Sequence, residues 1–228
     1  MKHFILFILI VLFSTTVYSQ RTQGGSVGVI KVNWYKQGWF LDGNVGARFL
    51  GKTSSTAEMS TGLSMNGGIG YMFNEFIGAK GRLDYNGYKV SPGHLTNVSN
   101  KSHSISLSAE AVVKLLQLIG PTKARDYALN FHAGFGITSL FNPEYNRYVT
   151  NDLGRKLDDP FIKGADDMFH IVLGINPQFH LSSKVSVNLD LSHFIQFKQH
   201  RTYDTFNGIR ADGVTGVMGI TLGMTYRL

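Results

Sequence analysis

The sequence predicts an all-β protein, an eight-stranded antiparallel barrel that crosses a membrane. Three observations predict it: apolar residues alternate along eight segments, formal charge is confined to the opposite face of those segments, and the chain offers no apolar run long enough for a spanning helix. The last segment shows the pattern most clearly, because every second residue from Met218 to Leu228 is apolar and the residues between them, Arg227 included, are small or polar. An apolar face of this kind is typical of a strand that meets lipid.

Side chains alternate between the two faces of a strand, so each segment assigns one set of residues to the outside of the barrel. None of the positions assigned to the outside carries a formal charge. The segments are 39–49, 63–73, 77–87, 105–115, 127–137, 169–179, 185–197 and 218–228.

The inward face carries the charges. Slipping the third segment by one residue would turn Lys80, Arg82 and Asp84 to lipid, where a cation near the midplane costs about 2–4 kcal/mol. A soluble barrel would show the reverse, with an apolar lumen and a charged outside. We therefore predict a lumen charge network of Asp42, Arg48, Lys80, Arg82, Asp84, Glu110, Lys114, Asp190, Lys198 and Arg227. Such charges could form a gate or a proton-shuttling chain, but a barrel this narrow favours simple filling of the lumen with paired groups.

Aromatic residues near the strand ends predict girdles at the two membrane interfaces. Tyr226 and the terminal Leu228 match the pattern of a signal for barrel assembly, although the terminal residue is Leu rather than Phe. The predicted girdle is Trp39, Tyr71, Phe73, Tyr85, Tyr127, Phe197 and Tyr226.

The N-terminus predicts export. Residues 1–19 combine Lys2, an apolar block of about ten residues and a small residue before Gln20, which is typical of a cleaved secretory signal peptide. Residues 20–37 are then expected to form a periplasmic extension, in which the partial alternation over 26–35 leaves an additional strand open, and residues 38–228 the barrel. The predicted location is the outer membrane of a Gram-negative bacterium.

Connection lengths predict the orientation. Short turns at 74–76 and 181–184 alternate with long polar connections at 50–62, 89–103, 139–167 and 199–214. Short turns face the periplasm in such barrels, so the long connections are expected outside the cell. Residues 116–126 are longer than this rule expects, and Pro177, which lacks an N–H group, predicts a bulge or an early strand end.

The sequence offers little for chemistry. There is no cysteine, and the net charge of +7 comes from dispersed residues, which does not indicate nucleic-acid binding. His132, His170 and His180 face inward on neighbouring segments, but nothing completes a four-ligand set, so we predict no metal and no cofactor. The acidic residues between 152 and 167 lack the spacing of a calcium-binding loop. Asn97 begins a glycosylation triplet, but such triplets are common by chance. No set of catalytic residues can be nominated.

Three stretches carry a resemblance to a known family: Gly70 to Asn74 with Lys80 to Tyr85, Ala128 to Gly136, and Ile175 to Gln178 before the turn at 181–185. They resemble the short outer-membrane barrels that form the N-terminal domains of OmpA-family proteins in the Bacteroidetes. It implies an OmpA/OmpX-like barrel. Family members continue into a peptidoglycan-binding domain, whereas this sequence stops at Leu228, so we expect no tether to the cell wall through such a domain.

Three functions follow as hypotheses. The first is a monomeric, non-enzymatic barrel with a structural or surface-interaction role, whose partners are outer-membrane lipid, the barrel-assembly machinery during biogenesis, and an envelope protein or glycan bound by the long loops. The second is a narrow channel for small solutes, with Lys80 and Arg82 as selectivity charges. The third is an accessory subunit of a secretion or surface assembly.

Overall fold

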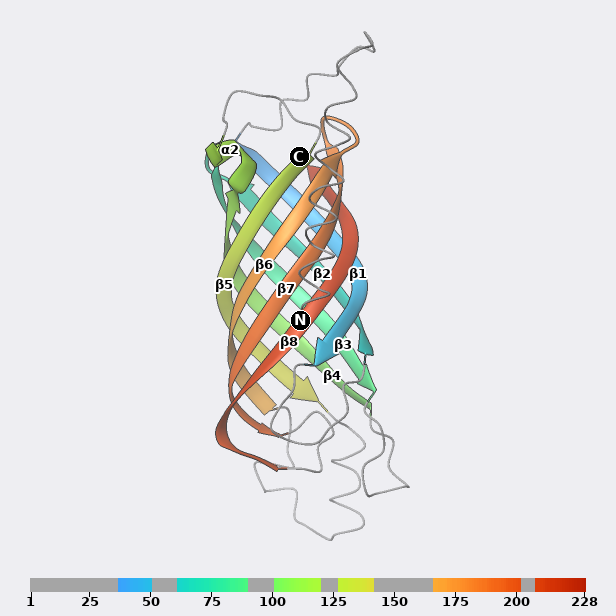
Figure 1. Cartoon of the computed structure of the whole chain (residues 1–228), viewed down its shortest axis with the longest axis vertical. Coiled ribbons are helices and arrows are strands. Elements are labelled where there is room, and N and C mark those ends of the chain that lie inside the picture. The colour runs from blue at the N-terminus through green and yellow to red at the C-terminus, as the bar shows by residue number, and fades with distance from the viewer. Residues whose placement is uncertain (1–36, 51–60, 90–100, 120–126, 142–165, 202–207) are drawn as a thin grey trace. The chain divides into compact units, whose positions relative to one another are not determined.

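The computed structural model describes residues 37–50, 61–89, 101–119, 127–141, 166–201 and 208–228, and these residues form a closed barrel of eight strands (Figure 1). One short helix, α2 (Leu115–Ile119), follows the fourth strand. The strands are β1 (Gly38–Leu50), β2 (Thr61–Met72), β3 (Ile77–Lys89), β4 (Lys101–Lys114), β5 (Tyr127–Phe141), β6 (Asp166–His180), β7 (Val185–Arg201) and β8 (Gly208–Arg227).

Each strand pairs antiparallel with the next one in the chain, and β1 closes the barrel against β8. The closing ladder runs from Phe40 opposite Arg227 to Leu50 opposite Val217. Closure leaves no strand edge with unpaired backbone groups, which is the condition for a sheet to exist in hydrocarbon. The predicted eight-stranded antiparallel barrel is confirmed.

The predicted sidedness also holds along the eight strands, with the exception of Lys198 on β7. Leu83 and Leu107 point outward, and each has 56% of its surface exposed. Arg82 and Asp84, the residues on either side of Leu83 in β3, are only 1% and 0% exposed. The same alternation of exposed and buried residues runs through the other strands. The outside of the barrel is therefore apolar and the buried charges face inward, the arrangement that a lipid-facing barrel requires.

The two ends of the barrel differ in their connections. At one end, which we name the turn end, Asn74 Oδ1 accepts hydrogen bonds from the Phe76 and Ile77 N–H groups at 2.8 Å each. Ser182 Oγ does the same for the Lys184 and Val185 N–H groups at 3.3 and 3.1 Å. These side chains satisfy backbone donors that the tight turns would otherwise leave unpaired. The opposite end, the loop end, is where the longer connections join the strands.

Two connections differ from the sequence prediction. The predicted connection 199–214 is largely strand, because β7 continues to Arg201 and β8 begins at Gly208. Backbone pairing continues beyond the band that touches lipid, so the apolar alternation marks only part of each strand. The connection 116–126 begins with α2, which the sequence analysis did not predict.

Pro177 does not produce a bulge. The register of β6 against β7 is the same on both sides of it, from Ile175 opposite Leu191 to Gln178 opposite Asn188. The Asn176 side-chain amide instead donates to the Leu189 carbonyl at 3.4 Å, next to the point where proline has no N–H to offer. The ladder is interrupted there without an inserted residue.

Some predictions fall on residues outside the described ranges. They are the signal peptide at 1–19, the extension at 20–37 except its last residue, the additional strand at 26–35, Asn97, and the acidic residues of the longest connection up to 165.

Candidate functional site in the barrel lumen

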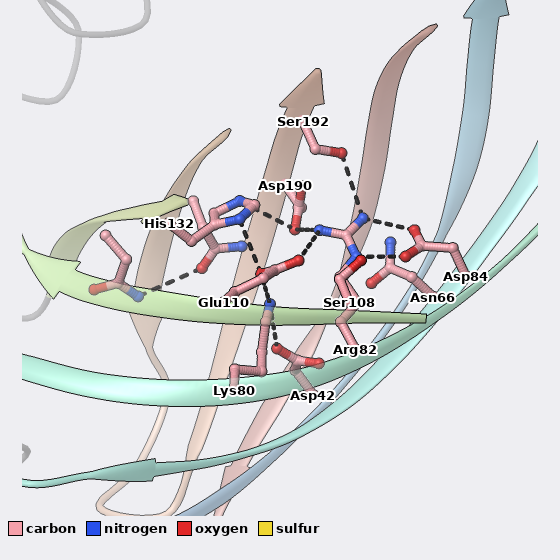
Figure 2. Close-up of polar contacts among 12 residues, drawn as sticks. Asp42, Asn66, Lys80, Arg82, Asp84, Ser108, Glu110, His132, Asp190 and Ser192 are labelled. Carbon is pink, nitrogen blue, oxygen red and sulfur yellow. Dashed lines mark hydrogen bonds and ion pairs between the residues drawn. The ribbon is translucent and has the colours of Figure 1, made fainter. Parts of the chain in front are cut away.

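Arg82 of β3 lies at the centre of an ion-pair network that crosses the lumen (Figure 2). Its Nε and Nη2 donate to the two carboxylate oxygens of Asp84, on the same face of the same strand, at 2.9 and 2.8 Å. Its Nη1 donates to Asp190 of β7 at 3.0 Å, and Nη2 also reaches Ser192 Oγ at 3.3 Å. A guanidinium presents its donors in a rigid planar fork, and here the fork joins β3 to the strand four positions around the barrel.

A second arginine completes this side of the network. Arg48 Nη2 of β1 donates to Asp84 Oδ1 at 3.0 Å. The Arg48 guanidinium carbon lies 4.3 Å from the centre of the Phe194 ring, and the Arg82 guanidinium carbon lies 5.5 Å from it. Phe194 is itself fully buried. The ring therefore offers both cations a favourable aromatic face while it excludes water from their pairs with acid.

Lys80 holds the other side of the network. Its Nζ lies 3.2 Å from Asp42 Oδ2 and 3.3 Å from Glu110 Oε2. His132 Nδ1 lies 3.0 Å from the same Glu110 oxygen, and His132 Nε2 lies 3.7 Å from Asp190 Oδ2 (Figure 2). The network thus links four carboxylates with three permanent cations, and its side chains come from β1, β3, β4, β5 and β7.

This network fills the middle of the lumen with charges that need one another. Moving a charged side chain from water into the protein interior costs free energy. This cost is offset only when oppositely charged partners and hydrogen bonds replace the lost water. The ion pairs on this side of the network are shielded from solvent, because no partner in them is more than 1% exposed: Arg48, Arg82, Asp84 and Asp190. The arrangement binds distant strands together and blocks the lumen at this level.

The loop-end half of the lumen is closed by different chemistry. An apolar cluster lies there, and beside it His170 bonds two hydroxyl groups, Ser108 Oγ through Nε2 and Thr138 Oγ1 through Nδ1, at 2.9 Å each. The cluster consists of Tyr88, Leu140, Met168, Val172, Phe194 and Val217. The charge pattern of the sequence predicts a polar lumen and does not predict this cluster. The signal that could have indicated the cluster is the presence of apolar residues at inward, even-numbered positions of β6 and β7, such as Val172 and Phe194.

Glycines make room for the largest inward side chains. His132 is paired with Gly174 across the ladder, Glu110 with Gly134, and His170 with Gly136. A Cβ atom on Gly174 would collide with the His132 ring, and one on Gly134 would collide with the backbone of β4. The lumen of an eight-stranded barrel is only wide enough for side chains to fill, so a large residue is accommodated opposite an empty position.

Three residues of the predicted charge network lie apart from it. Lys114 and Arg227 lie at the turn end, where the Arg227 Nη2 donates to the Gln37 carbonyl at 3.3 Å. Lys198 is exposed at the loop end and does not enter the lumen, which corrects the prediction. Its backbone has φ = 60°, and the register of β7 against β8 shifts between Gln196 and Gln199. This bulge turns the side chain away from the inside.

The predicted girdle residues fall into two groups on the outer surface. At the turn end, Trp39 contacts Tyr71 and Tyr71 contacts Phe73 edge to face, with ring centres 5.1 and 5.7 Å apart. At the loop end, the Phe197 ring centre lies 6.3 Å from that of Phe169. Phe169 and Phe179 are separated by about 33 Å along β6. For a strand tilt of about 40°, this corresponds to about 25 Å along the barrel axis, which is the height of the apolar band of such barrels. Of the remaining girdle residues, Tyr127 and Tyr226 lie at the turn end and Tyr85 lies toward the loop end.

The histidines considered as metal ligands do not meet. His132 belongs to the ion-pair network, His170 to the hydroxyl cluster, and His180 to the turn end of β6. Within the described residues, no three His, Cys, Asp or Glu side chains are placed to hold a metal ion. The described part of the chain also has no helix with the length and apolarity needed to traverse a membrane.

No model of a known protein family matches the sequence, and no curated protein sequence is significantly similar to it. Among solved structures, Neisserial surface protein A matches with a TM-score of 0.50 and 10% identity, over 83% of this chain and 97% of that one. The attachment invasion locus protein Ail of Yersinia pestis matches with a TM-score of 0.44 and 12% identity, over 85% and 100% of the two chains. The outer membrane protein OprG of Pseudomonas aeruginosa gives 0.46 and 8%, over 86% and 98%.

These identities support a shared fold only. The closed antiparallel barrel of this chain is thus an architecture already seen among outer-membrane proteins. The relation to OmpA-family proteins of the Bacteroidetes stays a prediction.

Proposed function

We propose that this chain is a non-enzymatic outer-membrane β-barrel protein that acts as a structural or surface-interaction protein through the connections at its loop end. The observation that carries the proposal is the sidedness of the wall. Large apolar side chains cover its outside, while the described charged groups of the network are sealed inside. In water such a surface would be costly, whereas in a bilayer it contacts hydrocarbon, and the closed sheet of the described residues has no open strand edge.

The orientation supports a role at the cell surface. The strands at the turn end are joined by tight turns and by the segment that begins with α2. Residues 51–60, 90–100, 142–165 and 202–207 connect the strands at the loop end. Placing the turn end in the periplasm, as in other outer-membrane barrels, directs these four connections outside the cell. The predicted signal peptide and the terminal Tyr226 and Leu228 fit delivery to the barrel-assembly machinery, and the proposed state is a monomer surrounded by lipid.

The closed lumen favours this function over a channel. The ion-pair network and the apolar cluster lie in series along the lumen, so a solute would have to separate buried ion pairs in order to pass. The purified barrel in a planar bilayer is expected to show no steady conducting state. Regular openings that change with Lys80→Ala or Arg82→Ala would contradict the proposal and favour a channel with those two residues as selectivity charges.

The role of the loop end is tested by replacing residues 142–165 with a glycine–serine segment of equal length. The barrel should still form, since the ladders between its strands do not involve this segment. Detergent extracts of native membranes should then yield at least tenfold less of any envelope protein or glycan that the unaltered chain retains. The matched control replaces 51–60 in the same way. Equal retention by all three proteins would contradict a surface-interaction role for the longest connection.

A further inference from the structure

One outward residue of the lipid-facing wall, His193 of β7, carries a polar side chain. It lies opposite Leu173 of β6 and Met218 of β8 across the two ladders. The other outward residues that the structure describes on these three strands between the two girdles are apolar or glycine. A polar side chain in the hydrocarbon region of a membrane is costly, so it is expected to have a function and a partner.

The depth of His193 follows from its place on the strand. It comes four residues before Phe197, whose ring belongs to the girdle at the loop end. Four residues of strand are about 13 Å long, or about 10 Å along the barrel axis for a tilt of about 40°. The His193 backbone therefore lies within the apolar band, where a ring nitrogen without a hydrogen-bond partner costs free energy.

The His193 ring leans toward the loop end, over Gly216 of β8. A Cβ atom on Gly216 would lie 3.0 Å from Cε1 and 3.4 Å from Nε2 of the ring. Gly216 is paired with Ile195, which is two residues nearer to Phe197 than His193 is. The ring thus brings Nε2 to about 5 Å below the girdle. The missing side chain at Gly216 is what leaves room for this orientation.

The two ring nitrogens of His193 have different surroundings. Nδ1 is buried in the wall and has no hydrogen-bond partner among the described residues. A neutral imidazole has one nitrogen that donates and one that accepts, and a buried N–H group without an acceptor is a rare defect in proteins. We therefore assign the proton to Nε2, so that the ring presents an N–H donor over Gly216.

The neighbours of His193 restrict what can accept this hydrogen bond. The exposed side chains of Leu173 and Met218 stand on either side of the half-buried ring, so a broad, rigid partner such as a second barrel would meet them first. A lipid is flexible enough to reach between them. The polar atoms of a lipid that lie nearest to the hydrocarbon are the ester carbonyls at the head of the acyl chains, which accept hydrogen bonds.

We propose that His193 binds one lipid of the leaflet at the loop end, by donating a hydrogen bond from Nε2 to an ester carbonyl, while the acyl chain of that lipid lies along Leu173 and Met218. This inference rests on the proposed membrane location, because it requires a bilayer around the wall. It does not depend on the loops, since every residue that it uses belongs to a strand.

The direct test is a contact between the ring and the lipid. The full chain, labelled with ¹⁵N in its histidine rings, is refolded into vesicles of phosphatidylcholine that carries ¹³C at the ester carbonyls. Solid-state NMR is expected to show a dipolar coupling between the lipid carbonyl and His193 Nε2, whose signal is identified by its loss in His193→Phe. His170, which is sealed in the lumen and bonded to Ser108, is the internal reference and should show none.

A matched pair of variants tests the role of Gly216. Gly216→Val fills the space that the ring occupies and is expected to lower the coupling to His193 at least about fivefold. Gly43→Val is the control, because it adds the same side chain at an exposed, outward glycine of β1 where a Cβ atom would meet nothing within 4 Å. The control should leave the coupling unchanged.

A second measurement compares vesicles of the ester lipid with vesicles of its ether-linked analogue, which has no carbonyl. The change from ester to ether lipid is expected to raise the equilibrium constant for unfolding roughly threefold to tenfold more in the unaltered chain than in His193→Phe, the usual contribution of one hydrogen bond. Contacts that other residues make with the carbonyls cancel in this comparison.

The outcomes separate this inference from the membrane location. The outward Leu222 methyl groups should contact the acyl chains in the same vesicles. If they do and His193 shows no carbonyl coupling, the inference is overturned and the membrane location stands. If neither contact is found, the membrane location fails as well. A coupling of the ring to a second, ¹³C-labelled copy of the chain instead of to lipid would overturn the inference in favour of a dimer.

Discussion

Replacing Arg82 with methionine is expected to lower the free energy of unfolding by about 3–5 kcal/mol, the usual cost of leaving buried charges without their partner. Arg82 pairs with Asp84 through two hydrogen bonds and with Asp190 through a third. Its removal leaves Asp190 with the His132 ring, 3.7 Å away, as its remaining neighbour among the ion pairs of the described residues. Methionine fills much of the volume, so the loss reports on charge rather than on a cavity.

Equilibrium unfolding in urea, from lipid vesicles into which the chain refolds reversibly, measures this loss. Lys184→Met is the control, because it removes a cation that is exposed at a turn, and its effect is expected to stay below about 1 kcal/mol. Arg82→Lys should fall between the two, since an ammonium group restores the charge but not the planar fork. An Arg82→Met variant as stable as the control would show that the network contributes nothing to the fold.

The second large effect is expected on the outside of the wall. Leu83 lies in the middle of β3, points outward, and is 56% exposed. Leu83→Arg is expected to destabilise the barrel in vesicles by about 2–4 kcal/mol, because the guanidinium must then lie near the midplane of the hydrocarbon.

Leu181 provides a matched control for this change. It has the same exposed fraction, 56%, but lies in the turn at 181–184, where an arginine reaches the interface and is expected to cost about 0–1 kcal/mol. Vesicle unfolding titrations of the two variants measure the difference. Equal losses for Leu83→Arg and Leu181→Arg would mean that exposure alone matters and that no bilayer surrounds the wall.

Sidedness and register could be predicted from sequence because both are local properties of a strand. A period of two is read along each segment separately, and one charge on the wrong face is enough to reject a register. Lys80, Arg82 and Asp84 fix β3 in this way, since all three must share one face. The strand count follows from the number of such segments, so the fold required no knowledge of long-range contacts.

The partners inside the lumen could not be predicted, because they depend on the stagger between strands. Nothing near Arg82 in the sequence indicates that Asp190 lies within 3.0 Å of it. The same limit applies to the pairing of His132 with Gly174, which appears only when the two strands are aligned. Phe194 could not be predicted because an inward aromatic residue contradicts the expectation of a polar lumen, and its contact with the guanidinium groups of Arg48 and Arg82 explains the exception.

Strand ends were the other weak point of the sequence prediction. Apolar alternation marks the lipid-facing band, but hydrogen bonding between β7 and β8 continues past it, and no side-chain pattern records that extension. Lys198 was assigned to the lumen by counting in steps of two, and the count fails at the bulge between Gln196 and Gln199. An inserted residue of this kind reverses every later assignment on its strand.

The central claim is that hydrocarbon surrounds the barrel while its lumen is sealed, and it can be tested on the unaltered protein. In lipid bicelles, a fatty acid with a nitroxide near the end of its chain broadens methyl NMR signals that touch the bilayer core. The methyl signals of Leu83, Leu107 and Leu222 should be lost, while those of Leu140, Val172 and Val217 keep their intensity. Equal broadening of both groups, or loss confined to the second group, would contradict the account.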